Sequence, residues 1–205
     1  MPSDILRKRK IAVLGSRSVG KSSLVIQFIE SHFVESYYPT IETTHTKSIN
    51  YRGVEYDCDI IDTAGQVCLR CLFFNVGDTV FQDEYTILNP KHAIGIHGYV
   101  LVYSVASRKS FNMVNLVYDK IVDFCGLNTI PCVIVGAKTD LPKASRQVEE
   151  SEGQRLADEH HAAFVETSAK NNQNVAEVFQ LCLGEIERQS PNHHDEPPAS
   201  KCIIM

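Results

Sequence analysis

Gly15-Ser-Arg-Ser-Val-Gly-Lys-Ser22 is the stretch of sequence that decides the fold. Its spacing is G-x-x-x-x-G-K-[ST], which is typical of a loop that wraps nucleotide phosphates. Residues 10–14 before it predict a buried strand, and residues 22–30 after it predict a helix with its apolar side chains on one face. This chemistry needs a strand, a glycine-containing loop and a helix in that order. The stretch therefore predicts a phosphate-binding loop rather than a chance match in a surface loop.

Backbone N–H groups and two side chains supply the chemistry of this loop. Glycine lets the backbone curl so that successive N–H groups point inward at phosphate oxygens. The N-terminus of the helix adds a partial positive charge. We expect Lys21 to reach the β and γ phosphates and the Ser22 hydroxyl to ligate Mg²⁺. The predicted nucleotide contacts in this loop are Gly15, Ser18, Val19, Gly20, Lys21, Ser22 and Ser23.

The size and composition of the chain indicate one globular domain with a tail. Of its 205 residues, 43% are hydrophobic and 22% are charged, as in ordinary soluble domains. A formal net charge of −5 argues against a nucleic-acid-binding protein, which usually has a basic face. No apolar run marks a signal peptide or a membrane span. The seven scattered cysteines predict buried free thiols in a reducing compartment, and Cys68-Leu-Arg-Cys71 lacks the second pair that a zinc site needs.

Apolar strand-like runs alternate with helix-like segments along the chain. Strands are predicted at 10–14, 56–61, 98–103, 131–135 and 163–166, and helices at 22–30, 110–125, 151–160 and 175–188. The turn-like Asn50-Tyr-Arg-Gly53 before 54–61 predicts one antiparallel strand. Together these elements predict an α/β fold, a mostly parallel six-stranded sheet with helices on both faces. Ligands of such sheets bind at the carboxyl ends of the strands, where the motifs lie.

Two further segments can contact the phosphates and a metal ion. Thr40 lies in a loop after the first helix, where its hydroxyl can ligate Mg²⁺ and its N–H can contact a γ-phosphate. Asp62-Thr-Ala-Gly-Gln66 ends a buried strand. We expect Asp62 to hold the metal through a water, the Gly65 N–H to sense the γ-phosphate, and Gln66 to orient the attacking water as the catalytic residue.

Ala137-Lys-Thr-Asp140 and Ser168-Ala-Lys170 predict that the base is guanine. Asp140 can accept hydrogen bonds from guanine N1–H and from the exocyclic amine, whereas adenine offers no such pair. The predicted base contacts are Lys138 along the base, Asp140, and the backbone N–H groups of Ser168, Ala169 and Lys170 on guanine O6. An ATP-using phosphate-loop enzyme would share the first loop but not Asp140. Competition of ATP against GTP for binding separates these two interpretations.

The chain ends in a segment that carries a lipidation signal. Residues 189–205 contain Pro, His, Asp and Ser and predict a flexible tail after a domain at 1–188. The last four residues, Cys202-Ile-Ile-Met205, have the form of a prenylation signal, and a final Met favours farnesyl. One lipid chain gives only reversible attachment. We therefore expect a cytoplasmic protein that samples the cytosolic face of endomembranes such as lysosome, Golgi or ER.

With these motifs the chain resembles the Ras superfamily of small GTPases, and within it the Rheb group. The resemblance runs from about residue 9 to residue 170 and resumes at the last four residues. Arg17 is its sharpest detail, because most Ras relatives have a small residue there. The Rheb-like stretches are Arg17-Ser-Val-Gly-Lys-Ser-Ser23, Phe33-Val-Glu-Ser-Tyr37, Thr44-His-Thr-Lys47, Asp83-Glu-Tyr85 and Gly98-Tyr-Val-Leu-Val-Tyr-Ser104.

The resemblance implies a monomer that cycles between GTP and GDP with Mg²⁺ and hydrolyses GTP slowly unaided. It implies a GTPase-activating protein of the tuberin type as a partner and the TOR kinase complex as effector. It also implies that Val34 and Tyr37 close over the nucleotide. The implied effector-binding residues are Tyr38, Thr40, Ile41 and Glu42.

The chain departs from the Rheb pattern at three places. Tyr38 replaces an Asp, which alters a charge that a partner could read. Ala137 replaces the Asn that ties the guanine-binding loop to the phosphate loop, so we expect faster nucleotide exchange. Residues 67–82, most of them apolar, stand between Gln66 and Asp83, which are adjacent in the family. Such an insertion can misplace Gln66, so the alternative interpretation is a nucleotide-binding signalling module with impaired hydrolysis.

An unspliced intron is a second explanation of residues 67–82. Val codons begin with GT, and Gln82 can be encoded by CAG after pyrimidine-rich Phe codons, which would give the two ends of an intron. Transcript reads that join Gln66 to Asp83 would establish the intron, and reads through the segment would exclude it. Gln82 also precedes Asp83, but Gln66 is preferred because it follows Gly65, whose position the buried strand sets.

Overall fold

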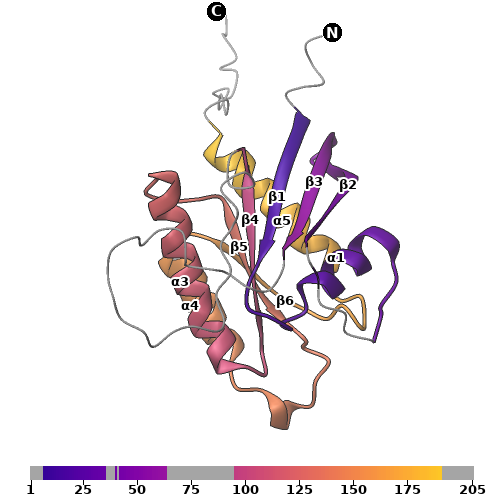
Figure 1. Ribbon diagram of the computed structural model, residues 1–205, viewed down its shortest axis with the longest axis vertical. Coiled ribbons are helices and arrows are strands. Elements are labelled where there is room, and N and C mark those ends of the chain that lie inside the picture. Colours follow the sequence, from indigo (N-terminus) through magenta and orange to yellow (C-terminus); the bar gives the residue numbers. More distant parts are fainter. Residues whose placement is uncertain (1–6, 36–39, 41, 64–94, 191–205) are drawn as a thin grey trace, which may run out of the picture.

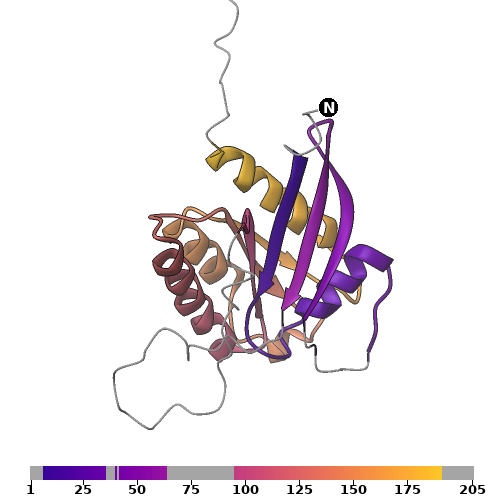
Figure 2. The same cartoon turned by 45° about the horizontal axis from the view of Figure 1, so that its top comes forward.

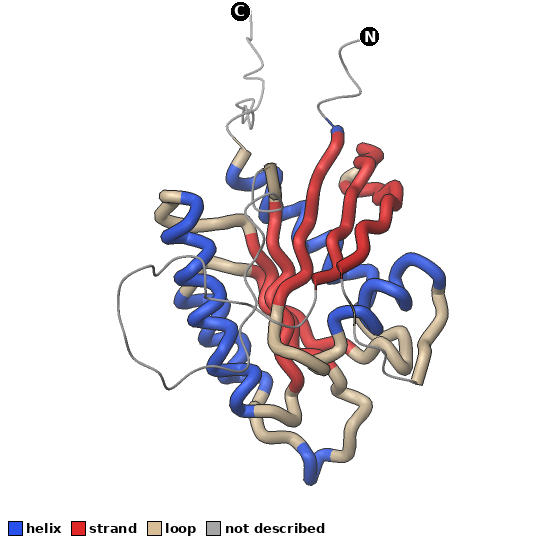
Figure 3. The backbone as a smooth tube through the Cα atoms, viewed as in Figure 1, coloured by secondary structure: helices blue, strands red, loops and turns tan. Residues whose placement is uncertain are grey.

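The computed structural model describes residues 7–35, 40, 42–63 and 95–190. Its centre is a six-stranded sheet with the strand order β2-β3-β1-β4-β5-β6 (Figures 1 and 3). The strands are β1 (Lys8–Leu14), β2 (Glu42–Tyr51), β3 (Val54–Thr63), β4 (Gly98–Ser104), β5 (Cys132–Ala137) and β6 (Ala163–Thr167). Every neighbouring pair is parallel except β2 with β3. The predicted mostly parallel α/β sheet is thus confirmed.

Helices cover both faces of the sheet because the central strands are apolar on both sides. The helices are α1 (Lys21–Glu30), α3 (Arg108–Cys125), α4 (Glu150–Glu159) and α5 (Val175–Gln189). In β1, Ile11 and Val13 join the core under α1 and α5, while Ala12 and Leu14 join the core under α3 and α4. Buried side chains on both faces are typical of a parallel strand inside an α/β sheet.

Strand β2 was not predicted as a range of residues, and only the turn before β3 pointed to it. In that turn, Arg52 and Gly53 have φ values of 50° and 80°, which suit a two-residue hairpin turn. β3 extends to Thr63, so Asp62 lies inside the strand rather than just after the strand predicted at 56–61. This longer strand places the Asp62 side chain on a rigid element.

Helix α3 begins at Arg108, two residues before the predicted start at Ser110. Ser107 caps the helix, because its side chain accepts a hydrogen bond from the Ser110 N–H. Ser110 is instead buried, and its hydroxyl accepts a hydrogen bond of 3.0 Å from the Ser104 N–H at the end of β4. The cap at Ser107 thus sets the start of the helix two residues earlier than predicted.

Three of the cysteines are free and fully buried, as predicted: Cys58, Cys132 and Cys182. Burial raises the pKa of both the Cys58 and Cys132 thiols to about 12, so they stay protonated. The pair at 68 and 71 lies outside the described residues. Among the described helices, none has the length and apolar character needed to cross a membrane.

A bidentate ion pair ties α3 to α4 near their N-terminal ends. Arg108 Nη1 and Nη2 lie 2.6 and 2.9 Å from the two carboxylate oxygens of Glu152. Hydrogen bonds from Arg108 lower the pKa of Glu152 from 4.5 to about 2. Because the folded state favours the carboxylate, the pair contributes stability above pH 4.5 and loses it as the pH falls toward 2.

Replacing Glu152 by Gln should therefore lower the free energy of unfolding at neutral pH and matter less in acid. Urea unfolding of the parent and of Glu152→Gln, from neutral to acidic pH, measures the difference in their free energy of unfolding. Glu159→Gln is the matched control, since the Glu159 carboxylate lies 3.9 Å from Arg155 in an exposed ion pair. A difference between the parent and Glu152→Gln that stays constant from neutral to acidic pH would contradict the prediction.

Candidate nucleotide-binding site

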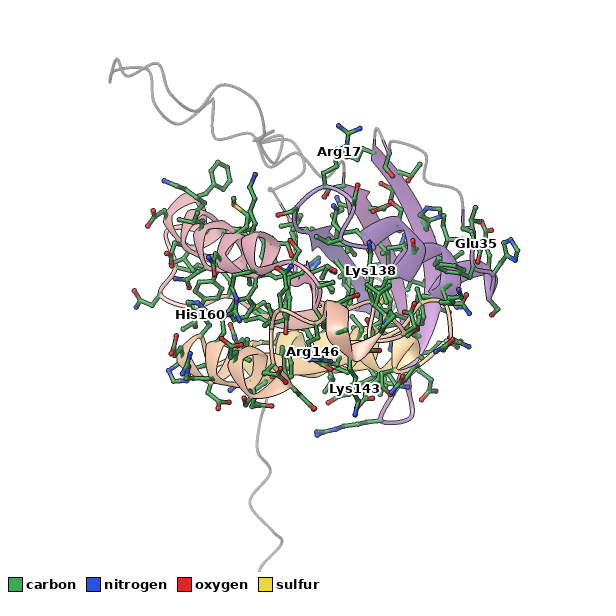
Figure 4. All side chains as sticks on the ribbon, turned by 90° about the horizontal axis from the view of Figure 1, so that it is seen from below. Arg17, Glu35, Lys138, Lys143, Arg146 and His160 are labelled. Atoms are coloured by element: carbon green, nitrogen blue, oxygen red, sulfur yellow. The ribbon has the colours of Figure 1, made fainter. Side chains whose placement is uncertain are left out.

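The predicted motifs meet at the carboxyl ends of the parallel strands. The phosphate loop follows β1, Asp62 lies near the end of β3, Asp140 follows β5, and Ser168 follows β6. This end is at the bottom of Figure 1 and faces the viewer in Figure 4. Because β1, β3, β4, β5 and β6 all run in one direction, residues far apart in sequence converge there.

The phosphate loop lies so close to β4 that its first residue must be glycine. Gly15 has φ +148°, and a Cβ built there would lie 2.1 Å from the carbonyl oxygen of Val102. Lys21 is buried, and its ammonium donates hydrogen bonds to the carbonyls of Gly15 at 3.0 Å and Ser16 at 2.9 Å. Burial lowers the pKa of Lys21 to about 8, and the charge of Asp62 opposes the shift. A buried ammonium held by neutral carbonyl groups favours an anionic ligand.

Ser22, Thr40 and Asp62 bring oxygen atoms together beside the phosphate loop. Ser22 Oγ and Thr40 Oγ1 lie 2.7 Å apart. Asp62 is 2% exposed, and its Oδ1 atom has no hydrogen-bond partner among the described residues. Burial raises the pKa of Asp62, while a hydrogen bond from Ser22 and the charge of Lys21 oppose the shift. Hydroxyl and carboxylate oxygens suit Mg²⁺, and a buried carboxylate oxygen that lacks a partner fits such an ion.

Histidine and cysteine provide no competing metal site in the ranges that the structure describes. No group of three or more His, Cys, Asp or Glu side chains that could hold a metal occurs there. The corner formed by Ser22, Thr40 and Asp62 is a metal candidate on its own chemistry, because its oxygen donors are those of a hard divalent cation rather than of zinc.

The two predicted base-binding segments contact each other and the phosphate loop. Ser168 Oγ donates a hydrogen bond of 2.7 Å to Asp140 Oδ1. Lys138 Nζ donates one of 2.7 Å to the carbonyl oxygen of Ser18. Asp140 is exposed, so its carboxylate is open to a ligand while Ser168 holds its orientation. The arrangement can present a fixed carboxylate to the edge of a base.

Ala137 is buried at the end of β5, next to the phosphate loop. A Cβ built on Gly20 would lie 3.8 Å from Ala137 Cβ and 3.7 Å from Lys138 Cε. The two loops are therefore within van der Waals distance, and Lys138 provides a hydrogen bond between them. An amide side chain in place of Ala137 could add hydrogen bonds at this contact.

Glu35 makes a contact that the sequence did not predict. Its carboxylate lies 3.6 Å from Lys170 Nζ, so it joins the segment after α1 to the segment after β6. In Figure 4, which looks onto this end of the molecule, Glu35 lies toward the right-hand edge and Lys138 lies near the centre. The Glu35 and Lys170 side chains are 79% and 54% exposed, so the pair is weak by itself. Opposite charges in the two segments were the only hint of it in the sequence.

Two other unpredicted contacts involve backbone acceptors. Ser16 offers its carbonyl oxygen to Lys21, and Thr63 Oγ1 donates a hydrogen bond of 2.8 Å to the carbonyl oxygen of Val13. The second contact ties the end of β3 to β1 beside the phosphate loop. A backbone acceptor has no signature in the residue type, so neither contact could be found by motif.

The structure describes most but not all of the predicted site residues. Val19 and Ser23 lie in the phosphate loop and the first turn of α1, Val34 is 37% exposed, and Glu42 begins β2. Ala169 is half-buried beside Lys170. The predicted residues outside the described ranges are Tyr37, Tyr38, Ile41, Gly65, Gln66 and Cys202, together with residues 67–82. The roles of all these residues stay predictions.

Comparison with known proteins gives the family. The family model described as "Ras family" matches residues 10–72 and 67–188. The chain is 50% identical to "Small monomeric GTPase RhbA" of Aspergillus fumigatus over 97% of each chain. It is 51% identical to "GTP-binding protein rhb1" of Schizosaccharomyces pombe over 97% of this chain and 98% of that protein. It is 46% identical to "GTP-binding protein Rheb" of Homo sapiens over 89% and 90%.

These matches confirm the family predicted from the sequence. The structure supplies the sheet and the phosphate loop that the family implies, and the similarity to proteins named Rheb extends over most of the chain. This chain is therefore a Rheb-like member of the Ras family.

Proposed function

We propose that this chain is a small GTPase that binds GTP and GDP with Mg²⁺ and hydrolyses GTP to GDP and phosphate. The observation that carries the proposal is the meeting of three features at one end of the sheet: the buried Lys21 ammonium, the oxygen atoms of Ser22, Thr40 and Asp62, and the Asp140–Ser168 pair. A single guanine nucleotide would span all three. Relatives named as a GTPase or GTP-binding proteins support the same activity.

The proposed roles divide between phosphate binding and water positioning. Backbone N–H groups of residues 15–23 and the Lys21 ammonium would hold the phosphates. Ser22 and Thr40 would ligate Mg²⁺ directly and Asp62 through a water; when bound, the ion neutralises charge on the β and γ phosphates. Gln66 would orient the attacking water, and the Gly65 N–H would contact the γ-phosphate.

Guanine specificity is the part of the proposal that rests on Asp140. Its orientation is held by the 2.7 Å hydrogen bond from Ser168, so the carboxylate is pre-positioned for two donors of guanine. Competition of GTP and ATP against a fluorescent GDP analogue tests this. We expect GTP to displace the analogue and ATP to fail at equal concentration. Equal displacement by both would point to the ATP-using enzyme.

A second candidate function is a nucleotide-binding signalling module with little turnover. It is favoured by Ala137 at the contact between two nucleotide-binding loops and by residues 67–82 directly after Gln66. Single-turnover hydrolysis of bound GTP, with and without a tuberin-type activating protein, separates the two candidates. Acceleration by the activator supports a GTP hydrolase, and no acceleration supports the module.

Asp62→Asn tests the proposed metal corner. The parent should release GDP faster when Mg²⁺ is chelated. The ratio of the GDP release rate with chelator to the rate with Mg²⁺ should be roughly tenfold smaller in the variant, as for residues that hold a metal through another group. Asp59→Asn is the matched control, since Asp59 lies on the same strand and accepts a hydrogen bond of 2.9 Å from Thr46 at the surface. An unchanged Mg²⁺ response in Asp62→Asn would remove Asp62 from the metal site.

The signalling role is proposed from the resemblance to Rheb. The chain would act as a monomeric domain at 1–188 that activates a TOR-type growth kinase complex when GTP is bound. Residues 189–205 would form the tail, with Cys202 farnesylated. The protein would then sample the cytosolic face of endomembranes. Cys202→Ser should abolish the partitioning of the protein into membranes, and unchanged partitioning would exclude the anchor.

A further inference from the structure

Basic side chains gather at the end of the sheet opposite the nucleotide-binding site. β1 begins there, β2 turns into β3 there, and α5 ends there, at the top of Figures 1 and 2. Arg7, Lys8 and Arg52 are exposed, and Lys10 is half-buried. We call these four residues the basic end. Its position separates it from every predicted nucleotide contact.

The side chains of the basic end differ from neighbouring arginines in their ion pairs. Two neighbouring arginines are already paired, since Arg9 Nη2 lies 2.7 Å from Glu187 and Arg188 contacts Glu185. Within residues 7–35, 42–63 and 95–190, by contrast, the four side chains of the basic end form no ion pair. Arg52 lies over the ring of Tyr51, 5.3 Å from its centroid.

Acidic residues near the basic end are fewer than the basic ones. Glu55 and Asp57 on β3 are exposed and Asp59 is half-buried. In the sheet register Lys8 stands opposite Asp57 and Lys10 stands opposite Asp59. The Asp57 carboxylate accepts a hydrogen bond of 2.9 Å from Ser48. The four basic side chains thus outnumber these three carboxylates by one, in a chain whose formal net charge is −5. This local reversal of sign favours an anionic partner.

The tail leaves the domain at the same end. α5 ends at Gln189, and residues 190–202 connect it to Cys202. The composition of these residues predicts a flexible chain, for which this length gives a root-mean-square extension of about 20 Å. A lipid on Cys202 would therefore hold the basic end near a bilayer surface. The tail adds little attraction, because Asp195 and Glu196 oppose Lys201.

We propose that the basic end docks on a bilayer surface that contains anionic lipids. A single lipid chain gives marginal attachment and needs a second signal, and the basic end supplies it from the folded domain rather than from the tail. Anionic headgroups attract basic residues that lie within a Debye length of the surface. Docking in this orientation points the nucleotide-binding end away from the bilayer, where partners can reach it. The inference rests on the proposed lipidation of Cys202.

The test uses the full-length farnesylated chain and vesicles of two compositions, phosphatidylcholine alone and phosphatidylcholine with phosphatidylserine. The parent should bind the mixed vesicles more tightly. In the triple variant Arg7→Gln, Lys8→Gln, Arg52→Gln, the affinity for the mixed vesicles should fall by a factor of about five for each charge removed. The matched control removes the same charge elsewhere, by Lys109→Gln, Lys143→Gln and Arg155→Gln. Retention of bound GDP checks that both variants are folded.

The outcomes separate the basic end from the lipid anchor. Loss of the phosphatidylserine-dependent gain in the first variant but not in the control supports the proposal. A gain that survives in the first variant, or that falls equally in both variants, overturns it. A parent protein that binds neither kind of vesicle overturns the lipid anchor on which the inference rests. A Cys202→Ser variant that binds both kinds of vesicle as well as the parent does also overturns it.

Discussion

Deleting residues 67–82, so that Asp83 follows Gln66, should raise activator-stimulated GTP hydrolysis by about 100-fold, the usual cost of an angstrom-scale misplacement. Gln66 is proposed to hold water in line with the γ-phosphate, and a long apolar insertion begins at the next residue. The Ras family model matches the chain in two parts, 10–72 and 67–188, which overlap inside this segment. The match agrees with an extra segment in an otherwise continuous Ras-like sequence.

Single-turnover release of phosphate from GTP-loaded parent and deletion variant measures the effect. GDP affinity is the internal control, because neither the phosphate loop nor Asp140 is altered. In the full-length chain, Gln66→Leu and Gln82→Leu show which glutamine supports residual hydrolysis. Equal activator-stimulated rates for the parent and the deletion variant would mean that the inserted segment leaves the catalytic machinery intact.

The elements that the sequence predicted well are those with apolar side chains on both faces or with strong helical periodicity. β1, β4 and β5 are short apolar runs, so their existence and parallel packing followed from residue type alone. β2 was missed because Glu42–Tyr51 is a mostly polar edge strand with little burial. Its pairing depends on β3 and on the turn at Arg52 and Gly53, which is information from outside the strand.

Motifs predicted the residue types of the site but not the contacts between them. The hydrogen bonds from Ser168 to Asp140 and from Lys138 to Ser18 join segments that are distant in the sequence. They exist because parallel strands bring the loops that follow them to one edge of the sheet. The partner atom of Lys138 is a backbone carbonyl oxygen, which no residue type reveals. The same limit applies to the Glu35–Lys170 pair, whose two side chains belong to no shared motif.

Ala137→Asn should slow the release of GDP by roughly 5–150-fold, since the restored hydrogen bonds together contribute on the order of 1–3 kcal/mol. Ala137 is 5% exposed at the end of β5, and its Cβ lies 3.8 Å from the position of a Cβ on Gly20. An amide there would lie between the loop proposed to bind the base and the loop proposed to bind the phosphates. Lys138 already joins these loops through the Ser18 carbonyl, so the amide would strengthen an existing contact.

The displacement of a fluorescent GDP analogue by excess GDP gives the release rate of each protein. Ala137→Leu is the control, because leucine fills a similar volume without an amide. If hydrogen bonding is the cause, the Asn variant slows release and the Leu variant leaves release unchanged or speeds it by crowding the phosphate loop. Equal slowing in both variants would assign the effect to packing, and release from the Asn variant as fast as from the parent would show that Ala137 does not limit nucleotide retention.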